Sequence, residues 1–522
     1  MAPDRQASAQ PPAQPSFILR GHASQIHSVR FLRHNTRLLT GDADGYIVFW
    51  KVETKRPLAV WHAHDGAILG TAAWGHDKII THGRDNSLRI WQLRPSDEAS
   101  LSSVLPAEEP KSPRPKPWLL HTLPVNTLNF CAFSMYHTQA PTQGRNPDHE
   151  TTEDDSSTTH DGSILIAVPA RDDKKAEVYQ FPEERIKFVV PRAQSADTGM
   201  IMALKLTHHR PSNCTLLLVG YEGGFTAAFV LSHNKGSAAT GVAELVYLSQ
   251  PHSQPILSLD VSPDGTTYFT SSADAIIAAH RIPDFAAATN EGPGQSTADV
   301  SATSTNNTRD ASTISHTTNS ASSPTQQTST VLTQDQPSKA QAACITSHPE
   351  EETLNFSKQS LSYAAHSNGK SAGLTSLLSS SNPAPLSQAA PTPPPVVTIQ
   401  SPYKVADTKH AGQQSLCIRS DGRIMATGGW DSRIRIYSTK TLKEVAVLKW
   451  HKEGVYAVDF GEILEAGDLR NQNVYNDGRN TELIRKESGL SKLQRQREEQ
   501  MQLKHWIAGG AKDGKVSLWE VF

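Results

Sequence analysis

The chain has 522 residues, long enough for several domains or one large repeat fold, and its formal net charge is only −2. A charge this close to zero argues against binding of nucleic acid by the whole surface. The four cysteines lie far apart without a C-x-x-C pair, so neither a zinc site nor a disulfide framework is predicted. No apolar run approaches ~18 residues, so no membrane span is expected.

The N-terminal residues 1–15 are polar and rich in proline. They lack the apolar segment of a signal peptide, and we expect a disordered arm.

A pattern of two β-rich runs around a short polar turn recurs along the chain. The first example reads TRLLTGDADGYIVFW and the last reads HWIAGGAKDGKVSLW. An aspartate lies in each turn, and an aromatic residue or histidine follows it by six positions. Such an array predicts the four-stranded blades of a propeller. The pattern occupies residues 36–50, 77–91, 266–280, 423–437 and 505–519.

Two further units keep only part of this pattern. In one, Asp173 and Tyr179 keep the spacing of six, but Pro169 stands where other units have threonine. In the other, Glu222 takes the place of the aspartate. The sequence therefore predicts seven units. They span approximately residues 17–60, 61–98, 118–181, 186–232, 245–285, 398–442 and 444–522.

Four segments interrupt the units. Residues 99–117 are rich in proline and predict an extended linker, and residues 137–162 form an acidic, polar loop. Residues 286–397 are too polar to bury a core, so they predict a disordered insertion between the fifth and sixth units. Residues 462–504 are charged and rich in helix formers, and we expect a helix within the seventh unit. The propeller is thus predicted in two parts, residues 16–285 with blades 1–5 and residues 398–522 with blades 6 and 7.

The repeats resemble those of the WD40 family. RGHASQIHSVRFL followed by LLTGDADGYIVFW has the Gly-His, Asp-Gly and Trp positions of a WD40 unit. WHKEGVYAVDF followed by IAGGAKDGKVSLW resembles it nearly as well. The resemblance implies an all-β fold, a seven-bladed WD40 β-propeller with insertions.

In WD40 blades a histidine, a turn aspartate, a hydroxyl and a tryptophan form a buried polar network, which makes a blade rigid when every group is paired. Here the resemblance assigns two full sets and two partial ones. They are His22, Thr40, Asp44 and Trp50; His64, Thr81, Asp85 and Trp91; Thr427, Asp431 and Tyr437; and His451, Asp513 and Trp519.

Catalytic and metal-binding alternatives fit the sequence less well. A His–Asp–Thr cluster is also compatible with a nucleophile, its base and an orienting group. Recurrence in several blades favours a structural role, because one active site is enough for an enzyme. His62 and His64 form an H-x-H pair, but the sequence offers no third zinc ligand nearby. Phosphate-binding and hydrolase motifs are absent, so no enzyme activity, metal or cofactor is predicted.

Function is then expected on the surface. In a WD40 propeller the residue before each turn aspartate tends to point out on one rim. Those positions include Arg84, Trp430 and Lys512, and exposed Trp and Arg are the preferred anchors of protein interfaces. We therefore predict that these three residues belong to a partner-binding rim, with packing of Trp430 on a neighbouring blade as the alternative.

The chain ends with the strand-like run KVSLWEVF, which leaves the seventh unit one strand short. The N-terminal run Ser16–Arg20 lies directly before Gly21 and His22, where an outer strand belongs. We predict that this N-terminal strand pairs with the last C-terminal strand and closes the ring, which removes an open edge.

The first two and last two units also resemble the fungal ASTRA-associated protein 1 family. The matching stretches include PSFILRGHASQIHSVRFL and ATGGWDSRIRIYS. The resemblance implies a non-catalytic scaffold subunit of the ASTRA assembly, with other protein subunits as partners. That assembly is linked to chromatin remodelling and to maturation of phosphatidylinositol-3-kinase-related kinases, and its members are nuclear.

Two other functions remain open. A propeller can serve as the substrate receptor of a ubiquitin ligase, which predicts co-purification with ligase scaffold and adaptor subunits. A propeller enzyme or nucleotide-binding protein predicts a polar cluster in the central channel, and the sequence offers no candidate for one.

Overall fold

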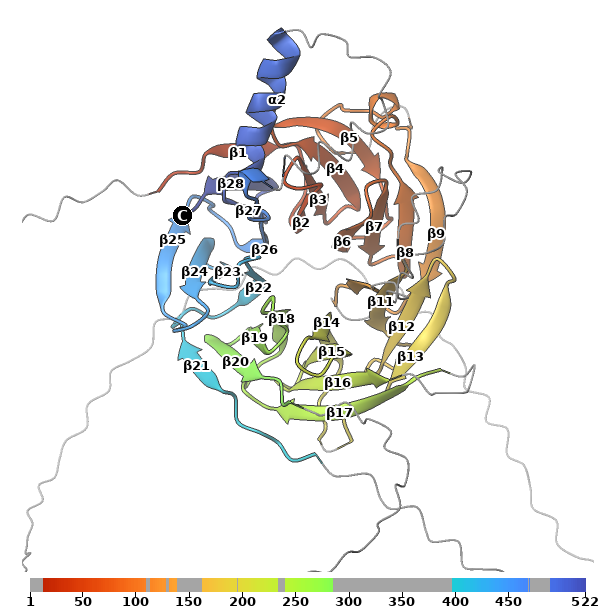
Figure 1. Cartoon of the computed structure of the whole chain (residues 1–522), viewed down its shortest axis with the longest axis vertical. Helices are drawn as coiled ribbons and strands as arrows, with labels where there is room; N and C mark the ends of the chain where they lie inside the picture. Colours follow the sequence, from red (N-terminus) through yellow and green to blue (C-terminus); the bar gives the residue numbers. More distant parts are fainter. Residues whose placement is uncertain are drawn as a thin grey trace, which may run out of the picture. The chain divides into compact units, whose positions relative to one another are not determined.

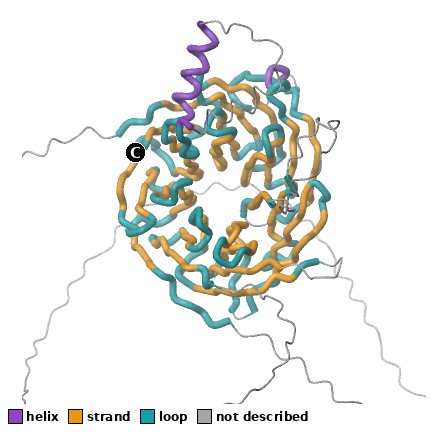
Figure 2. The backbone as a smooth tube through the Cα atoms, viewed as in Figure 1, coloured by secondary structure: helices purple, strands orange, loops and turns teal. Residues whose placement is uncertain are grey.

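The computed structural model describes residues 13–108, 113–127, 131–138, 162–194, 196–232, 240–284, 397–467, 469 and 489–522. Seven four-stranded antiparallel sheets follow one another around a ring (Figure 1). In each sheet the strand at one end lies beside the central channel, and the strand at the other end lies on the outside of the ring (Figures 1 and 2). We number the four strands of a blade from the inside to the outside. The prediction of an all-β, seven-bladed propeller is confirmed.

The first three blades run in order from their inner to their outer strands. Blade 1 consists of β2 (Ile26–Leu32), β3 (Arg37–Asp42), β4 (Tyr46–Lys51) and β5 (Arg56–His62). Blade 2 consists of β6 (Ile68–Trp74), β7 (Lys78–Gly83), β8 (Ser87–Gln92) and β9 (Trp118–Pro124), with the short 3-10 helix η1 (Glu98–Ser100) before β9. Blade 3 consists of β10 (Ser134–His137), β11 (Ile164–Pro169), β12 (Ala176–Phe181) and β13 (Arg185–Val190).

The remaining blades complete the ring. Blade 4 consists of β14 (Ile201–His209), β15 (Cys214–Tyr221), β16 (Thr226–Ser232) and β17 (Val242–Ser249). Blade 5 consists of β18 (Ile256–Val261), β19 (Thr267–Ser272), β20 (Ile276–Arg281) and β21 (Lys404–Asp407). Blade 6 consists of β22 (Gln413–Ile418), β23 (Ile424–Gly429), β24 (Arg433–Ser438) and β25 (Glu444–Lys449). Blade 7 consists of β26 (Val455–Phe460), β27 (Trp506–Ala511), β28 (Lys515–Glu520) and β1 (Phe17–Arg20).

The hydrophobic core lies between neighbouring blades. Five of the six residues of β4 are buried, because blades 7 and 2 cover the two faces of blade 1. One such layer joins Phe49 and Trp61 of blade 1 to Ile68 and Trp91 of blade 2. A strand covered on both faces reads as a continuous apolar run, which explains the sequence YIVFW of β4.

Five blade boundaries differ from the predicted ones, because in each of blades 2 to 6 the fourth strand falls wholly or mostly in the unit predicted to follow. These strands are β9, β13, β17, β21 and β25. β9 pairs with β8 and completes blade 2, whereas the sequence placed residues 118–124 in the third unit. β21 pairs with β20 and completes blade 5, so the insertion 286–397 lies within blade 5 and not between blades 5 and 6. In blades 2 and 5 a long insertion separates the fourth strand from the third. Because the recurring motif does not extend to the fourth strand, the sequence did not show where that strand belongs.

The ring closes between the two ends of the chain. β1 pairs antiparallel with β28, and the four residues Phe17 to Arg20 lie opposite Leu518 to Lys515. The side chain of Leu19 is 3% exposed and packs among core residues from blades 7 and 1. The predicted closure of the last blade by an N-terminal strand is therefore confirmed.

The expected helix is present as α2 (Gly489–Gln502), between β26 and β27, and stands out from the ring beside β1 (Figure 1). Asn35 of blade 1 anchors both ends of this insertion. Its Nδ2 donates to the carbonyls of Glu462 (2.7 Å) and Gln502 (2.9 Å), and its Oδ1 accepts from the Glu462 amide (2.8 Å). Within the described ranges no helix is long and apolar enough to cross a membrane.

Residues 1–12, 139–161, 285–396 and 470–488 lie outside the described residues. The disorder expected for the N-terminal arm, for the acidic loop and for the long insertion therefore stays a prediction.

Removal of residues 16–20 is expected to lower the free energy of unfolding of the whole ring. Burial of the Leu19 side chain alone is worth about 2 kcal/mol, and β28 would also lose its strand partner. Thermal and urea unfolding of the purified chain measure the effect. Deletion of residues 2–12 is the matched control and should leave both transitions in place. A chain that starts at residue 21 and melts like the full chain would contradict the closure.

Candidate functional site

The four predicted residues of blade 2 meet in one buried network. Nδ1 of His64 lies 2.9 Å from Oδ1 of Asp85, and its Nε2 lies 2.7 Å from Oγ1 of Thr81. The Trp91 Nε1 donates to the same hydroxyl at 2.8 Å. Burial lowers the pKa of His64 despite the neighbouring carboxylate, which favours a neutral ring. Every polar group of the set thus has a partner inside the blade.

Blade 1 has the same network with a different carboxylate. Nδ1 of His22 contacts Oδ2 of Asp42 at 2.7 Å, not the predicted Asp44. The rest of the set is as predicted, because His22 Nε2 and Trp50 Nε1 both reach Oγ1 of Thr40, at 2.7 and 2.9 Å. Asp44 is exposed, and only its backbone amide joins the network, by donating to Asp42 at 3.1 Å.

The position of Asp42 in β3 explains this correction. Asp42 ends β3 opposite Ile26, just as Gly83 ends β7 opposite Ile68 in blade 2. A carboxylate at the strand end points into the blade and is fully buried. The spacing rule selected Asp44 because it counts back from the tryptophan and takes no account of which way a side chain points.

Blade 7 takes its hydroxyl from another strand. Gly509 stands at the threonine position, and Ser517 of β28 replaces the missing hydroxyl. Nε2 of His451 lies 2.8 Å from the Ser517 Oγ, and Trp519 donates to the same oxygen at 2.8 Å. Nδ1 of His451 faces Asp513 at 3.3 Å, as predicted. Ser517 could have been found from the sequence as the one hydroxyl between Asp513 and Trp519.

Blade 5 carries a complete set and blade 6 does not. His252 contacts Asp274 (3.1 Å) and Thr270 (2.8 Å), as in blade 2. In blade 6 the predicted Thr427 donates to Oε1 of Gln413 (2.6 Å), whereas the equivalent threonines of blades 1, 2 and 5 contact a histidine. The predicted Asp431 and Tyr437 of that blade do not meet a histidine network either. Arg435 donates to both carboxylate oxygens of Asp431, at 3.0 and 2.6 Å, and Tyr437 is buried in the core beside Phe269.

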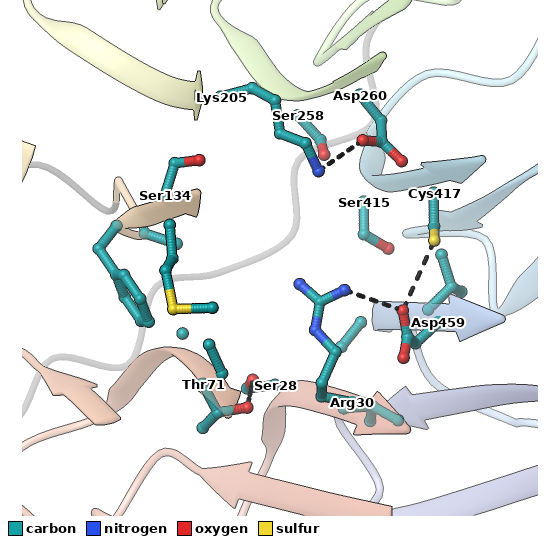
Figure 3. Close-up of a pocket in the computed structure, with 18 of the residues that line it drawn as sticks. Ser28, Arg30, Thr71, Ser134, Lys205, Ser258, Asp260, Ser415, Cys417 and Asp459 are labelled. Atoms are coloured by element: carbon teal, nitrogen blue, oxygen red, sulfur yellow. Dashed lines mark hydrogen bonds and ion pairs between the residues drawn. The ribbon is translucent and has the colours of Figure 1, made fainter. Parts of the chain in front are cut away.

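The central channel contains charged side chains that the sequence did not reveal (Figure 3). The channel encloses about 710 Å³. Arg30 of blade 1 pairs with Asp459 of blade 7 at 3.2 Å, and Lys205 of blade 4 pairs with Asp260 of blade 5 at 2.7 Å. The channel thus contains a polar cluster, for which the sequence offered no candidate.

These carboxylates also join neighbouring blades through the backbone. Oδ2 of Asp459 accepts the amide of Phe31 at 2.7 Å, and Oδ2 of Asp260 accepts the amide of Ile418 at 2.8 Å. Each inner strand has one edge without a strand partner, and these carboxylates satisfy one amide on each of two such edges. The channel cluster therefore holds the blades together.

The cluster has no activated nucleophile. The Cys417 thiol lies 3.6 Å from Asp459 (Figure 3), and burial raises its pKa far above the usual range, which keeps the thiol protonated. Within the part of the chain that the structure describes, no group of three or more His, Cys, Asp or Glu is placed to hold a metal ion.

Trp430 and Lys512 lie together on one rim. Trp430 follows β23, and its side chain is 48% exposed, so it is not covered by a neighbouring blade. Its Nε1 donates to Oε1 of Gln414 at 2.8 Å, and its ring rests on Gly412, where an added Cβ would come within 2.2 Å. The exposed Lys512 of blade 7 donates its amide to Gly454, which itself packs against Trp430.

Arg84 does not join this pair. It lies exposed on the turn of blade 2, and blades 7 and 1 separate it from the Trp430 turn. The Arg84 charge acts instead on His27, whose pKa is lowered mainly by burial and further by this guanidinium. The structure thus brings together two of the three predicted rim residues.

Six residues at the mouth of the channel were not predicted from the sequence. In six blades the inner strand has a β-bulge after its first residue, and a bulge redirects the extra side chain. In the four blades with a network histidine at this end, the extra residue follows that histidine by five positions, a usable sequence signal. The six residues line the channel, and they are His27, Leu69, Met202, Leu257, Gln414 and Tyr456.

The mouth and the rim form one continuous surface. The hydrogen bond between Gln414 and Trp430 links the two, and the Tyr456 ring lies 5.7 Å from His27 in an edge-on contact. We call the surface formed by Gln414, Trp430, Tyr456 and Lys512 the aromatic rim. Its residues come from blades 6 and 7 and are not used by the blade networks. The hydrogen bond to Gln414 and the contact with Gly412 hold the Trp430 ring.

Replacement of Asp42 by asparagine is expected to lower the free energy of unfolding by about 2 kcal/mol, because a buried carboxylate with three hydrogen-bonded groups loses its charge. Asp44→Asn is the matched control, two residues away, and should change it by less than about 0.5 kcal/mol. Urea unfolding of both variants measures the difference. Equal destabilisation, or a larger effect at Asp44, would contradict the corrected network.

Comparison with known proteins finds one family that matches nearly the whole chain. The family model described as ASTRA-associated protein 1 matches residues 15–519. The chain is 38% identical over 515 residues to ASTRA-associated protein 1 of Pyricularia oryzae, covering 98% of each chain. It is 36% identical over 512 residues to that of Verticillium alfalfae, covering 97% of this chain and 93% of the relative. The similarity extends to Schizosaccharomyces pombe, at 25% identity over 466 residues.

Proposed function

The chain belongs to the ASTRA-associated protein 1 family, and on this premise we propose that it is an adaptor subunit which holds other subunits of an ASTRA assembly on its aromatic rim. The chain is not an enzyme, because its family and its fold are those of non-catalytic propeller proteins. Its work is then to bring proteins together. The family resemblance supports a nuclear location and a link to chromatin remodelling and to maturation of phosphatidylinositol-3-kinase-related kinases.

One observation carries the proposal, namely that Trp430 is half exposed and yet held in place. A hydrogen bond to Gln414 and a flat contact with Gly412 fix the indole on the rim. A fixed aromatic side chain loses little conformational entropy on binding, which suits it to anchor an interface. Lys512 is exposed on the same rim, and its positive charge favours a partner surface with acidic groups.

Blade 6, which presents this tryptophan, has no histidine network. Asp431 follows Trp430 directly and is engaged by Arg435 instead of a histidine. The strand pairing of blade 6 is nevertheless complete. A departure from the repeat that leaves the blade intact is the kind of feature expected at a functional surface.

Replacement of Trp430 by alanine is expected to reduce recovery of ASTRA subunits with the tagged full-length chain by about tenfold or more, because loss of an interface anchor costs about 2 kcal/mol. Affinity purification with quantitative mass spectrometry measures the recovery. Val445→Ala is the matched control, since Val445 is also 48% exposed but lies on the outer strand β25. Thermal unfolding confirms that both variants fold.

The outcomes separate the two parts of the proposal. If the wild-type chain recovers no ASTRA subunits, the adaptor function is wrong, and recovery of ubiquitin-ligase scaffold and adaptor subunits would favour a substrate receptor instead. If the wild-type chain recovers them and the Trp430 variant keeps them all, the rim is not the binding surface.

A further inference from the structure

The outer edges of the blades differ in whether a linker of the same chain forms a hydrogen bond with them. An outermost strand leaves a row of backbone groups without a strand partner, and such an edge accepts a further strand. In the described residues, four of the seven edges receive a backbone hydrogen bond from a linker of the same chain. These bonds are Val60 to Ser102 (2.7 Å) on β5, Ala107 to Gly21 (2.6 Å) just beyond β1, Gly241 to Lys187 (2.8 Å) on β13, and Gln400 to Leu248 (2.8 Å) on β17.

The covering linkers share a geometry. Three of the four contacts are parallel β-bridges, at Ala107, Gly241 and Gln400. A linker can also bring an apolar side chain: Leu105 lies against Gly21, and Val397 packs on the core of blades 3 and 4. The ring therefore shows how its edges are completed. A short extended segment runs parallel to the outer strand and places an apolar residue beside it.

β9 of blade 2 is the edge best suited to a further strand. Over the described ranges, no backbone hydrogen bond reaches the outer edges of β9, β21 or β25. β21 has only four residues, and β25 carries Glu444 and Lys449 at its two ends, which discourages pairing. β9 has seven residues and exposes two large apolar side chains, Trp118 at 74% and Leu119 at 43%.

The register shows which amide of β9 faces outward. Thr122 of β9 lies opposite Arg89, one pair before the bulge between β8 and β9. In blade 1, Val60 of β5 has the equivalent position, opposite Val48 and one pair before the bulge between β4 and β5. The amide of Val60 points away from its blade and donates to Ser102. Thr122 has the same place in its strand, so its amide also points outward.

We propose that β9 is a docking site for an extended segment of a partner protein, which adds to blade 2 as a parallel fifth strand. The segment accepts a hydrogen bond from the amide of Thr122 and places an apolar side chain against Trp118. A second copy of this chain fits less well, because two-fold symmetry pairs identical edges antiparallel, whereas the ring's own bridges are parallel. The site lies on the outer surface and is separate from the aromatic rim.

The test compares Thr122→Pro, which removes the outward amide, with Thr122→Val, which keeps it. Outer strands tolerate proline where the amide faces solvent, and Pro124 already lies two residues further along β9. The probe is the assembly purified with the tagged full-length chain, and hydrogen exchange of residues 118–124 is compared with that of the free chain.

The proposal expects at least tenfold slower exchange of these amides in the assembly, loss of that protection with Thr122→Pro, and retention with Thr122→Val. Trp430→Ala should leave the protection of β9 in place in whatever assembly remains, which separates this site from the rim. Unchanged exchange on assembly would overturn the proposal, as would equal behaviour of the two Thr122 variants. If Thr122→Pro lowers the melting temperature, Trp118→Ser replaces it and must also reduce protection. Protection of β9 in a dimer of the free chain, detected by light scattering, would identify a second copy as the occupant and overturn the choice of partner.

Discussion

The pairing of β1 with β28 is the interaction on which the rest of the structure depends. Blade 7 contains strands from both ends of the chain, so this pair joins the C-terminal strands to the strand that leads into blade 1. The layer between the two blades combines Leu19 and Leu518 of blade 7 with Ile26 and Phe31 of blade 1. The bond from Phe31 to Asp459 and the anchoring of the α2 insertion by Asn35 cross the same boundary. Closure of the ring therefore fixes the channel and the position of α2 together.

The same constraint explains why the surfaces are rigid enough to bind partners. A closed ring cannot let one blade move without opening a layer of buried side chains. Within the blades, the networks around His22, His64, His252 and His451 hold the loops at the rim end. Blade 6 has no such histidine network, and there Gln414 and Gly412 fix Trp430 instead. The surfaces proposed for binding thus consist of residues that do not belong to the histidine networks of the blades.

Features that recur within a blade could be predicted from the sequence, and features between blades could not. The strands around each turn and the set of His64, Thr81, Asp85 and Trp91 follow from spacing within one unit. Spacing failed where direction matters, as at Asp42, and where a hydroxyl comes from a neighbouring strand, as at Ser517. The fourth strands of blades 2 to 6 lack the motif, so the sequence placed them in the unit that follows.

Contacts between residues far apart in the chain could not be predicted from one sequence. Arg30 and Asp459 are 429 positions apart, and nothing local to either residue indicates the other. The bulged residues at the channel mouth were within reach, because most of them follow a network histidine by a fixed distance. The sequence did not indicate these residues as a surface, because the direction of a bulged side chain is known only from the structure of the blade.

Native-state hydrogen exchange of the β28 amides, at Ser517 and Leu518 among others, tests the central claim most directly. If the N-terminal strand closes the ring, these amides exchange only through global unfolding, with the same free energy as the amides of β4 in blade 1. Exchange through local opening, as fast as on the outer strand β25, would show that the two ends of the chain are not part of one cooperative ring.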